Sequence, residues 1–342
     1  MRKILSIVIP TYNMESLLPR CLDSFVINMK QMCQTEIIIV NDGSRDGSSA
    51  IAHSYENKYP GIYKVIDKSN GNYGSCINAA LKVATGKYFR ICDADDCYIS
   101  ANLEAYIDFL SSVDVDIVFS PYETYCGDTL KSSFEVLDVL RERVFMIDEL
   151  RWDSPELFNF RAMHSMATKR EILVTNKYYQ TEGISYTDTQ FIFYSMLYAK
   201  NCCFYKDAIY VYYLGRDGQT MSPISLINSH MHFYENAKRM LIDYIEVESF
   251  ISRNKSTLLE MSIASCLGFY ISVVLCYLSN QRSKIKLFKE LLDMLNKTKR
   301  ASGFNKLLNK STPYKLWHRY HVPAIVIRAM YKCKTLLVSS NN

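Results

Sequence analysis

The stretch Gly86-Lys-Tyr-Phe-Arg-Ile-Cys-Asp-Ala-Asp-Asp96 decides how the first part of the chain folds. Its apolar and aromatic segment, Lys87 to Cys92, predicts a buried strand that begins after a helix-ending glycine. That strand runs directly into three carboxylates, which repel one another unless a divalent cation or strong hydrogen-bond donors compensate them. The stretch therefore predicts a strand whose carboxyl end meets a ligand. A solvated turn before a helix is the alternative, since Asp-x-Asp is common by chance.

Apolar runs on both sides of this stretch alternate between strand and helix patterns. Short β-branched runs predict further strands at Leu5–Ile9, Glu36–Val40, Tyr63–Ile66 and Asp116–Ser120. Helical spacing of apolar residues predicts helices at Glu15–Met29, Ser48–Tyr59, Ser75–Thr85 and Leu103–Leu110. Such alternation predicts an α/β fold with a mostly parallel sheet.

Polar clusters follow three of the predicted strands where each one ends. They are Thr11-Tyr12-Asn13, Asn41-Asp42-Gly43-Ser44 and Asp93 to Asp96. Ligands of open α/β sheets bind beyond the carboxyl ends of the strands, so these clusters are expected to share one site.

The residue types at this edge favour a metal-bound diphosphate. Mg²⁺ and Mn²⁺ take oxygen ligands, usually one or two carboxylates together with phosphate oxygens. The chain has no Gly-x-x-x-x-Gly-Lys-[Ser/Thr] loop and no Gly-x-Gly-x-x-Gly after the first strand, so phosphate recognition by metal is the coherent option. Asp42 is either the acceptor for the N3–H of a uracil ring or a plain turn former.

Together these motifs resemble glycosyltransferase family 2, whose members have the GT-A fold. The matching stretches are Ser6 to Asn13, Glu36 to Ser44 with Asp46 and Gly47, Gly74 to Asn78, and Gly86 to Asp96. The resemblance implies an α/β, GT-A architecture over residues 1–222, followed by a helical and basic region over residues 223–342.

The resemblance also implies a role for each matching position. The donor nucleotide would be lined by Pro10, Thr11, Tyr12, Asn13, Ser44 and Ala94, with Asp42 on the base, which favours uracil over guanine. Asp93 would contact the ribose or the metal, and Asp95 would be the main ligand of Mn²⁺ or Mg²⁺, with Asp96 able to share that duty. Asn41 stands where many members have Asp.

Asp188 matches the catalytic base of the family, although Thr187 replaces the Glu that often precedes it. A helix N-cap is the alternative role for Asp188. The implied reaction is an inverting transfer from a nucleotide-sugar, a UDP-sugar by preference, to a hydroxyl of a glycan or lipid-linked acceptor. The stretch Leu214 to Ser222 resembles a loop that closes over the site, in which Arg216 would either meet the diphosphate or be solvated.

The chain is basic from Gln281 to Asn342, with 14 Lys and Arg against 2 Asp and Glu. This charge has two explanations. The region is either a solvated helical face, or it binds the inner face of the cell membrane as part of a peripheral protein. Met261–Leu278 is long enough to span a bilayer, but its serines favour a buried or interfacial helix. His230 and His232 are either metal ligands or ordinary helix residues.

The N-terminus lacks the apolar run of a signal peptide, so we expect a cytoplasmic protein with free thiols at its 11 cysteines. A nucleic-acid-binding protein is disfavoured because the basic region shows no recognisable binding motif. A nucleotidyltransferase would need a Gly-rich basic loop near the start. A non-catalytic sugar-nucleotide-binding or scaffold protein remains the alternative, which Thr187 permits and Asp93, Asp95 and Asp188 oppose.

Overall fold

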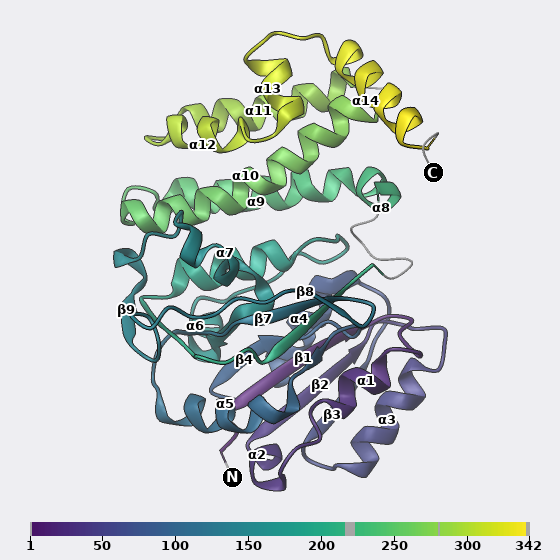
Figure 1. The fold of residues 1–342 in the computed structure, drawn as a ribbon, viewed down its shortest axis with the longest axis vertical. Coiled ribbons are helices and arrows are strands. Elements are labelled where there is room, and N and C mark those ends of the chain that lie inside the picture. Colours follow the sequence, from purple (N-terminus) through teal and green to yellow (C-terminus); the bar gives the residue numbers. More distant parts are fainter. Residues whose placement is uncertain (1, 216–222, 280, 340–342) are drawn as a thin grey trace. The chain divides into compact units, whose positions relative to one another are not determined.

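The computed structural model describes residues 2–215, 223–279 and 281–339. The chain divides into two compact units, Met1–Asp217 and Gly218–Asn342 (Figure 1). The division falls within residues 216–222, outside the described residues, so the predicted boundary at residue 222 stays a prediction.

The first unit is built on an eight-stranded sheet in the order β3-β2-β1-β4-β10-β6-β11-β9. Its strands are β1 (Leu5–Thr11), β2 (Thr35–Asn41), β3 (Tyr63–Asp67), β4 (Tyr88–Ile91), β6 (Ile117–Phe119), β9 (Val144–Met146), β10 (Met166–Lys169) and β11 (Asn201–Phe204). The first four strands run parallel, and every residue of β2 and β4 is buried, which explains their continuous apolar runs. The predicted α/β fold is confirmed.

The sheet is mostly parallel, as predicted, and of its described strands only β10 and β9 run antiparallel to their neighbours. Strand β10 pairs antiparallel with both β4 and β6, and it follows the segment 122–165, whose mixed pattern gave no strand prediction. A second sheet of order β5-β12-β7-β8 contains β5 (Cys97–Tyr98), β7 (Tyr122–Cys126), β8 (Thr129–Ser132) and β12 (Tyr210–Leu214). Strand β5 begins one residue after the acidic stretch, so β12 is brought against it from more than a hundred residues away.

The helices of the first unit are α1 (Leu18–Asp23), α2 (Met29–Cys33), α3 (Ser48–Lys58), α4 (Asn72–Val83), α5 (Ser100–Ser112), α6 (Arg170–Thr175) and α7 (Asp188–Tyr198). Single 3₁₀ turns occur at Ile147–Glu149, Pro155–Leu157, Asn159–Arg161 and Met163–Ser165.

The single helix predicted over Glu15–Met29 is wrong, because the chain forms α1 and α2 separately. The Ser24 hydroxyl donates to the carbonyl of Cys21 at 2.6 Å and accepts from the Tyr98 amide at 3.1 Å, which ends α1. The Asn28 side chain then accepts from the Lys30 amide at 2.9 Å and caps α2.

The second unit is helical, with α8 (Pro223–Asn228), α9 (His230–Val247), α10 (Arg253–Cys276), α11 (Arg282–Asn296), α12 (Ala301–Leu308), α13 (Thr312–His318) and α14 (Ala324–Ser339). Helix α10 packs against α9 and against α11 to α14. Among the described residues it alone is long and apolar enough to cross a bilayer, with a mean hydropathy of 1.9, yet 67% of its most apolar window is buried. Core helices share this property, so it is weak evidence for a membrane span.

Candidate active site

The carboxyl ends of β1 and β2 hold the first two predicted clusters against each other. The Asn13 amide donates to Ser44 Oγ at 3.0 Å, and the Arg45 amide donates to Asn13 Oδ1 at 2.8 Å. Asn13 has a φ of 53°, which Asn tolerates better than most residues. Thr11 is buried beside Pro10 while the Tyr12 ring stays 43% exposed. The five predicted residues from Pro10 to Asn13 and Ser44 therefore lie at one edge of the sheet.

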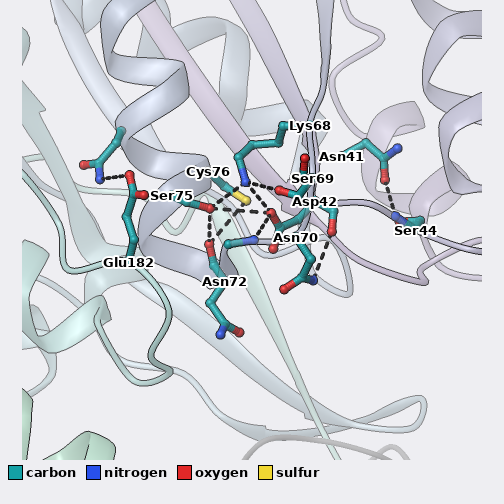
Figure 2. Close-up of polar contacts among 12 residues, drawn as sticks. Asn41, Asp42, Ser44, Lys68, Ser69, Asn70, Asn72, Ser75, Cys76 and Glu182 are labelled. Atoms are coloured by element: carbon teal, nitrogen blue, oxygen red, sulfur yellow. Dashed lines mark hydrogen bonds and ion pairs between the residues drawn. The ribbon is translucent and has the colours of Figure 1, made fainter.

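Asp42 is almost completely buried and is held through one carboxylate oxygen (Figure 2). Its Oδ1 accepts from Lys68 Nζ at 2.6 Å and from the Gly71 amide at 2.9 Å, with the Ser75 hydroxyl at 3.5 Å. The Asp42 amide donates to the Thr11 carbonyl at 2.9 Å, which ties this residue to β1. All three of these donors bind Oδ1, so the described contacts leave Oδ2 to accept a hydrogen bond from a ligand.

Asn41 is the departure from the family pattern, and the structure gives a physical reason for it. Its Nδ2 donates to Asp67 Oδ1 at 2.7 Å, while its Oδ1 accepts from the Ser44 amide at 3.1 Å. An Asp at this position would place a second carboxylate against Asp67. The amide side chain suits both partners, so this departure supports the turn that carries Asp42.

The acidic cluster of Asp93, Asp95 and Asp96 follows β4. One side-chain oxygen from each of the three lies within 4.8 Å of the others, which makes the cluster a candidate metal site among the described residues. Hard carboxylate oxygens at this spacing fit Mg²⁺ or Mn²⁺. Ala94 is buried between them, and Arg20 Nη2 donates to the Asp95 carbonyl at 2.6 Å. The backbone of the cluster is therefore fixed from a neighbouring helix.

Protein groups occupy both side-chain oxygens of Asp96. Oδ2 accepts from the Tyr210 hydroxyl at 2.6 Å, and Oδ1 accepts from the Tyr213 amide at 2.8 Å. Burial first, and then the charges of Asp93 and Asp95, raise its pKa well above the ordinary value. Asp96 therefore holds β12 beside the cluster, and these contacts leave Asp93 and Asp95 as the better candidates for metal ligation.

Asp188 is the first residue of α7, and the N-cap position falls on Thr187. Thr187 is buried and accepts from Gln180 Nε2 at 2.9 Å, so it packs inside the unit and does not cap the helix with its side chain. Burial raises the pKa of Asp188, while backbone hydrogen bonds from the helix start oppose that shift. A carboxyl whose pKa is raised is a stronger base for an acceptor proton.

Asp188 and the acidic cluster act electrostatically on the same two tyrosines, Tyr73 and Tyr212. Burial and Asp93 raise the pKa of Tyr73, and Asp188 adds to this shift. Burial also raises the pKa of Tyr212 to about 12, with contributions from Asp96, Asp93, Asp95 and Asp188. The carboxylates that follow β4 and the one that begins α7 thus lie within electrostatic range of the same two rings.

Helix α4 carries the contacts that fix the segment before Asp188. Asn78 Nδ2 donates to the Gln180 carbonyl at 2.8 Å, and the Gln180 amide returns a bond to Asn78 Oδ1 at 2.8 Å. Asn78 also donates to Glu182 Oε1 at 2.9 Å (Figure 2). Gly74 lies so close to this segment that a Cβ would collide with the carbonyl oxygen of Thr181. This contact gives a physical reason for the glycine in the Gly74 to Asn78 motif.

Three residues of the site were not predicted from the sequence: Lys68, Tyr73 and Tyr210. Lys68 directly follows β3, so the strand-end rule that found the other clusters also covers this residue. Tyr73 and Tyr210 carried no such signal, because their partners depend on tertiary structure. Arg216 and the rest of the predicted loop to Ser222 lie outside the described residues, apart from Leu214 and Gly215.

His230 and His232 belong to the helical unit, where the His230 Nδ1 atom lies 2.7 Å from the carbonyl of Ile227. The two histidines are not part of the candidate metal group found among the described residues. The ten described cysteines are free, as predicted.

Comparison with known proteins agrees with this architecture. Residues 6–173 match the model of glycosyl transferase family 2. An uncharacterized glycosyltransferase of Mycoplasma pneumoniae is 34% identical over 99 residues, covering 28% of this chain and 33% of that protein. The poly(ribitol-phosphate) beta-glucosyltransferase of Bacillus spizizenii is 31% identical over 221 residues, covering 64% of this chain and 33% of that protein.

Among solved structures, TarS 1-349 of S. aureus in complex with UDP-GlcNAc superposes with a TM-score of 0.66 at 18% identity, over 97% of this chain and 92% of that one. At this identity the likeness shows the fold, which is the GT-A fold. The matches to the first curated relatives span about a third to a half of their lengths. The fold is that of a GT-A transferase, and residues 6–173 of the chain belong to glycosyltransferase family 2.

Proposed function

We propose that this protein transfers a sugar, with inversion, from a UDP-sugar to a hydroxyl of a surface glycan or polymer, using Mn²⁺ or Mg²⁺. The observation that carries the proposal is the placement of Asp42 and the Asp93–Asp95 pair after β2 and β4, with Asp188 close enough to act on the same tyrosine, Tyr212, as that pair. A base reader, a diphosphate-metal site and a general base are the three parts that such a transfer needs.

The nucleotide would bind with its uracil ring at Asp42. The N3–H of uracil donates to Asp42 Oδ2, while Lys68 holds the other oxygen and stabilises the negative charge. The exposed ring of Tyr12 is available to pack on the base or ribose, with Pro10, Thr11, Asn13 and Ser44 forming the wall behind it. The structural relative TarS was solved with UDP-GlcNAc and with UDP, which supports uracil as the base.

Asp95, together with Asp93, would hold the metal, and Ala94 would line the pocket between them. When bound, the metal ion supplies a Lewis acid that stabilises the negative charge developing on the departing diphosphate. Asp96 stays bound to Tyr210 and Tyr213 and keeps the two ligand residues in register.

Asp188 would take the proton of the acceptor hydroxyl as that oxygen attacks the anomeric carbon. Its location at the helix start fixes its direction, and its partial burial makes it more basic than an exposed Asp. The bond to the diphosphate breaks as the new glycosidic bond forms, so a single displacement inverts the anomeric configuration without a covalent enzyme intermediate.

The proposed acceptor is supported by the names of two relatives. One relative is named a poly(ribitol-phosphate) glucosyltransferase and another a minor teichoic acid biosynthesis protein, so a polyol-phosphate or related surface polymer is the proposed acceptor class. The second unit would bring the enzyme to an anionic membrane on the cytoplasmic side. It carries no acidic residue after Asp293, and it exposes Ile325, Val326 and Met330 on α14.

The test is a turnover assay in which UDP release is measured with UDP-GlcNAc and UDP-glucose, with and without Mn²⁺, and with poly(ribitol phosphate) as acceptor. We expect release that needs both metal and acceptor, and a product whose anomeric configuration is opposite to that of the donor. Tight UDP binding without turnover on any UDP-sugar would instead favour the non-catalytic alternative. A product with retained configuration would contradict the single displacement.

A further inference from the structure

Tyr73 joins the first turn of α4 to the acidic cluster. Its hydroxyl donates to Asp93 Oδ1 at 2.7 Å and lies 3.2 Å from the Met163 sulfur. Its pKa is raised well above the ordinary value, by burial first and then by Asp93, so it remains a neutral donor at physiological pH.

A donor at this position solves a problem that the cluster itself creates. Three carboxylates within 4.8 Å repel one another, and an unrestrained Asp93 would rotate away from its neighbours. The Asp93 amide donates to the Tyr210 hydroxyl at 3.2 Å, a contact that restrains the backbone of this residue. The Tyr73 hydroxyl bonds to Oδ1 of the side chain, so it helps to hold the carboxylate of Asp93 in one orientation.

The same turn of α4 also holds the other end of the site. The Gly71 amide donates to Asp42 Oδ1 at 2.9 Å, two residues before Tyr73. Asn72 lies between them with a φ of 65°, a conformation that few non-glycine residues adopt, and the tight contact of Gly74 with Thr181 fixes the helix behind it. One rigid turn thus contacts both the base-reading carboxylate and a carboxylate of the diphosphate-metal site.

We propose that Tyr73 is a positioning residue that orients Asp93 for the metal-bound diphosphate. The inference rests on the proposed function and adds to it a separation of roles within one turn. Gly71 supports nucleoside recognition through Asp42, whereas Tyr73 supports only the metal and the diphosphate. Removing the Tyr73 hydroxyl should therefore weaken UDP binding with Mn²⁺ and leave uridine binding unchanged.

The experiment uses the full chain with Tyr73→Phe, which keeps the ring and its packing. Calorimetric titrations measure the affinity for UDP in the presence of Mn²⁺ and, separately, the affinity for uridine. Electron paramagnetic resonance measures the affinity for Mn²⁺ without nucleotide. Loss of an outer-shell hydrogen bond to a ligand carboxylate typically lowers metal affinity by about 10- to 100-fold. We expect a loss in this range for UDP with Mn²⁺ and for Mn²⁺ alone, with uridine affinity within about twofold of wild type.

Tyr55→Phe is the matched control. The Tyr55 hydroxyl also donates to a carboxylate, Asp23 Oδ1 at 2.6 Å, but on α1 and α3 and without contact to the acidic cluster. This control should leave all three affinities unchanged. In an Asp93→Asn background, Tyr73→Phe should have little further effect on these affinities, because the carboxylate that the Tyr73 hydroxyl orients is already absent.

The outcomes separate this inference from the proposed function. If the wild-type protein binds neither uridine nor UDP with Mn²⁺, the proposed function fails. If the wild type binds UDP with Mn²⁺ and Tyr73→Phe binds it equally well, only the positioning role of Tyr73 is overturned. An equal loss of uridine and UDP affinity in Tyr73→Phe would also overturn it, because the residue would then support the whole pocket.

Discussion

The two units of the molecule bury acidic side chains in different surroundings. In the first unit Asp42 lies in a loop at a strand end, with a Lys68 ammonium at 2.6 Å and a backbone amide on the same oxygen. In the second unit Glu260 lies in the middle of α10, where Tyr244 and Ser256 each donate to Oε1 at 2.9 Å and Arg300 stays 3.9 Å away. The first carboxylate has a direct cation and the second is satisfied mainly by hydroxyls.

The difference in partners distinguishes a carboxylate proposed to bind a ligand, Asp42, from one that stabilises a helical core, Glu260. Burial raises the pKa of Glu260, partly offset by its hydroxyl donors and Arg300, and a Cβ on Gly303 of α12 would lie 2.8 Å from its other oxygen. Glu260 thus joins three helices of one core. Asp42, in contrast, is anchored so that one oxygen remains for another partner. Equal burial therefore does not imply equal function; the location and the donors of each acid distinguish them.

The largest effect expected within the first unit follows from Asp188→Asn. The substitution keeps the size of the side chain but removes the base, so kcat should fall by about 10²–10⁴-fold. UDP affinity should stay near the wild-type value, which a titration checks. Asp128→Asn, in the exposed turn between β7 and β8, is the control and should retain activity. Full activity in Asp188→Asn would remove this residue from the mechanism.

The pH dependence of that residue has a defined sign. Because the folded-state pKa of Asp188 is raised, the folded protein binds its proton more tightly than the unfolded chain does. The free energy of unfolding therefore falls as pH rises from the pKa of Asp188 in the unfolded chain to its pKa in the folded protein. Over the same pH window kcat should rise, because the base becomes ionised. Asp188→Asn should raise the melting temperature at pH 7 while it lowers activity, and should flatten the acidic limb of the rate profile.

Lys68→Met tests whether Asp42 depends on its cation. Removing one partner leaves a buried carboxylate unpaired, and because Lys68 is partly exposed we expect a loss of about 1–3 kcal/mol in unfolding free energy. UDP and uridine should both bind more weakly, since both use the base site. The control is Lys64→Met, an exposed lysine of β3. Chemical denaturation measures both variants, and equal stabilities would contradict the role given to Lys68.

A pair of glycines compares the two units directly. Gly74→Ala would push a methyl group into the Thr181 carbonyl, so it should destabilise the protein by about 1–3 kcal/mol. Gly268→Ala in α10 meets nothing within 4 Å and should stabilise its helix by about 0.5–1 kcal/mol. Melting temperatures of the two variants should move in opposite directions. A shift of the same sign in both would contradict the close packing assigned to Gly74.

The smallest effect concerns the surface of the second unit. Sedimentation with vesicles should show binding that increases with the fraction of anionic lipid, because each Lys or Arg near such a surface contributes about 1 kcal/mol. Ile325→Asp with Met330→Asp should reduce that binding several-fold without changing UDP affinity. Arg282→Gln, at the start of α11, should have a weaker effect. Equal binding to neutral vesicles would argue against an electrostatic membrane contact.

The sequence predicted the first unit best where strands end in polar residues. Pro10 to Asn13, Asp42 and Asp93 to Asp96 were placed at one edge because parallel strands align their carboxyl ends, and the structure brings them together. The sequence did not predict β10, β12 or the partners of Asp96, because these depend on pairings across more than forty residues. The roles of these residues stay predictions until ligand binding is measured.

The helix boundary at Asp23 shows a second limit. Apolar periodicity continues from Leu17 to Val26, yet the Ser24 hydroxyl and the amide of Tyr98 end the helix early. Periodicity reports the buried face of a segment and contains no information on a partner that arrives from another strand. In the second unit the same periodicity predicted helices correctly but offered no motif for their function.

The central claim is that the strand ends of the first unit bind a uridine diphosphate with a metal. The most direct measurement is a thermal-shift titration of UDP, GDP and CMP, each with and without Mn²⁺, on wild type and on Asp95→Ala. A ligand at 100 times its Kd stabilises the folded state by about 2.7 kcal/mol, which raises the melting temperature measurably. We expect a Mn²⁺-dependent shift with UDP that is the largest of the three and is lost in Asp95→Ala. No shift with any nucleotide at millimolar concentration, or an equal shift in Asp95→Ala, would contradict this claim.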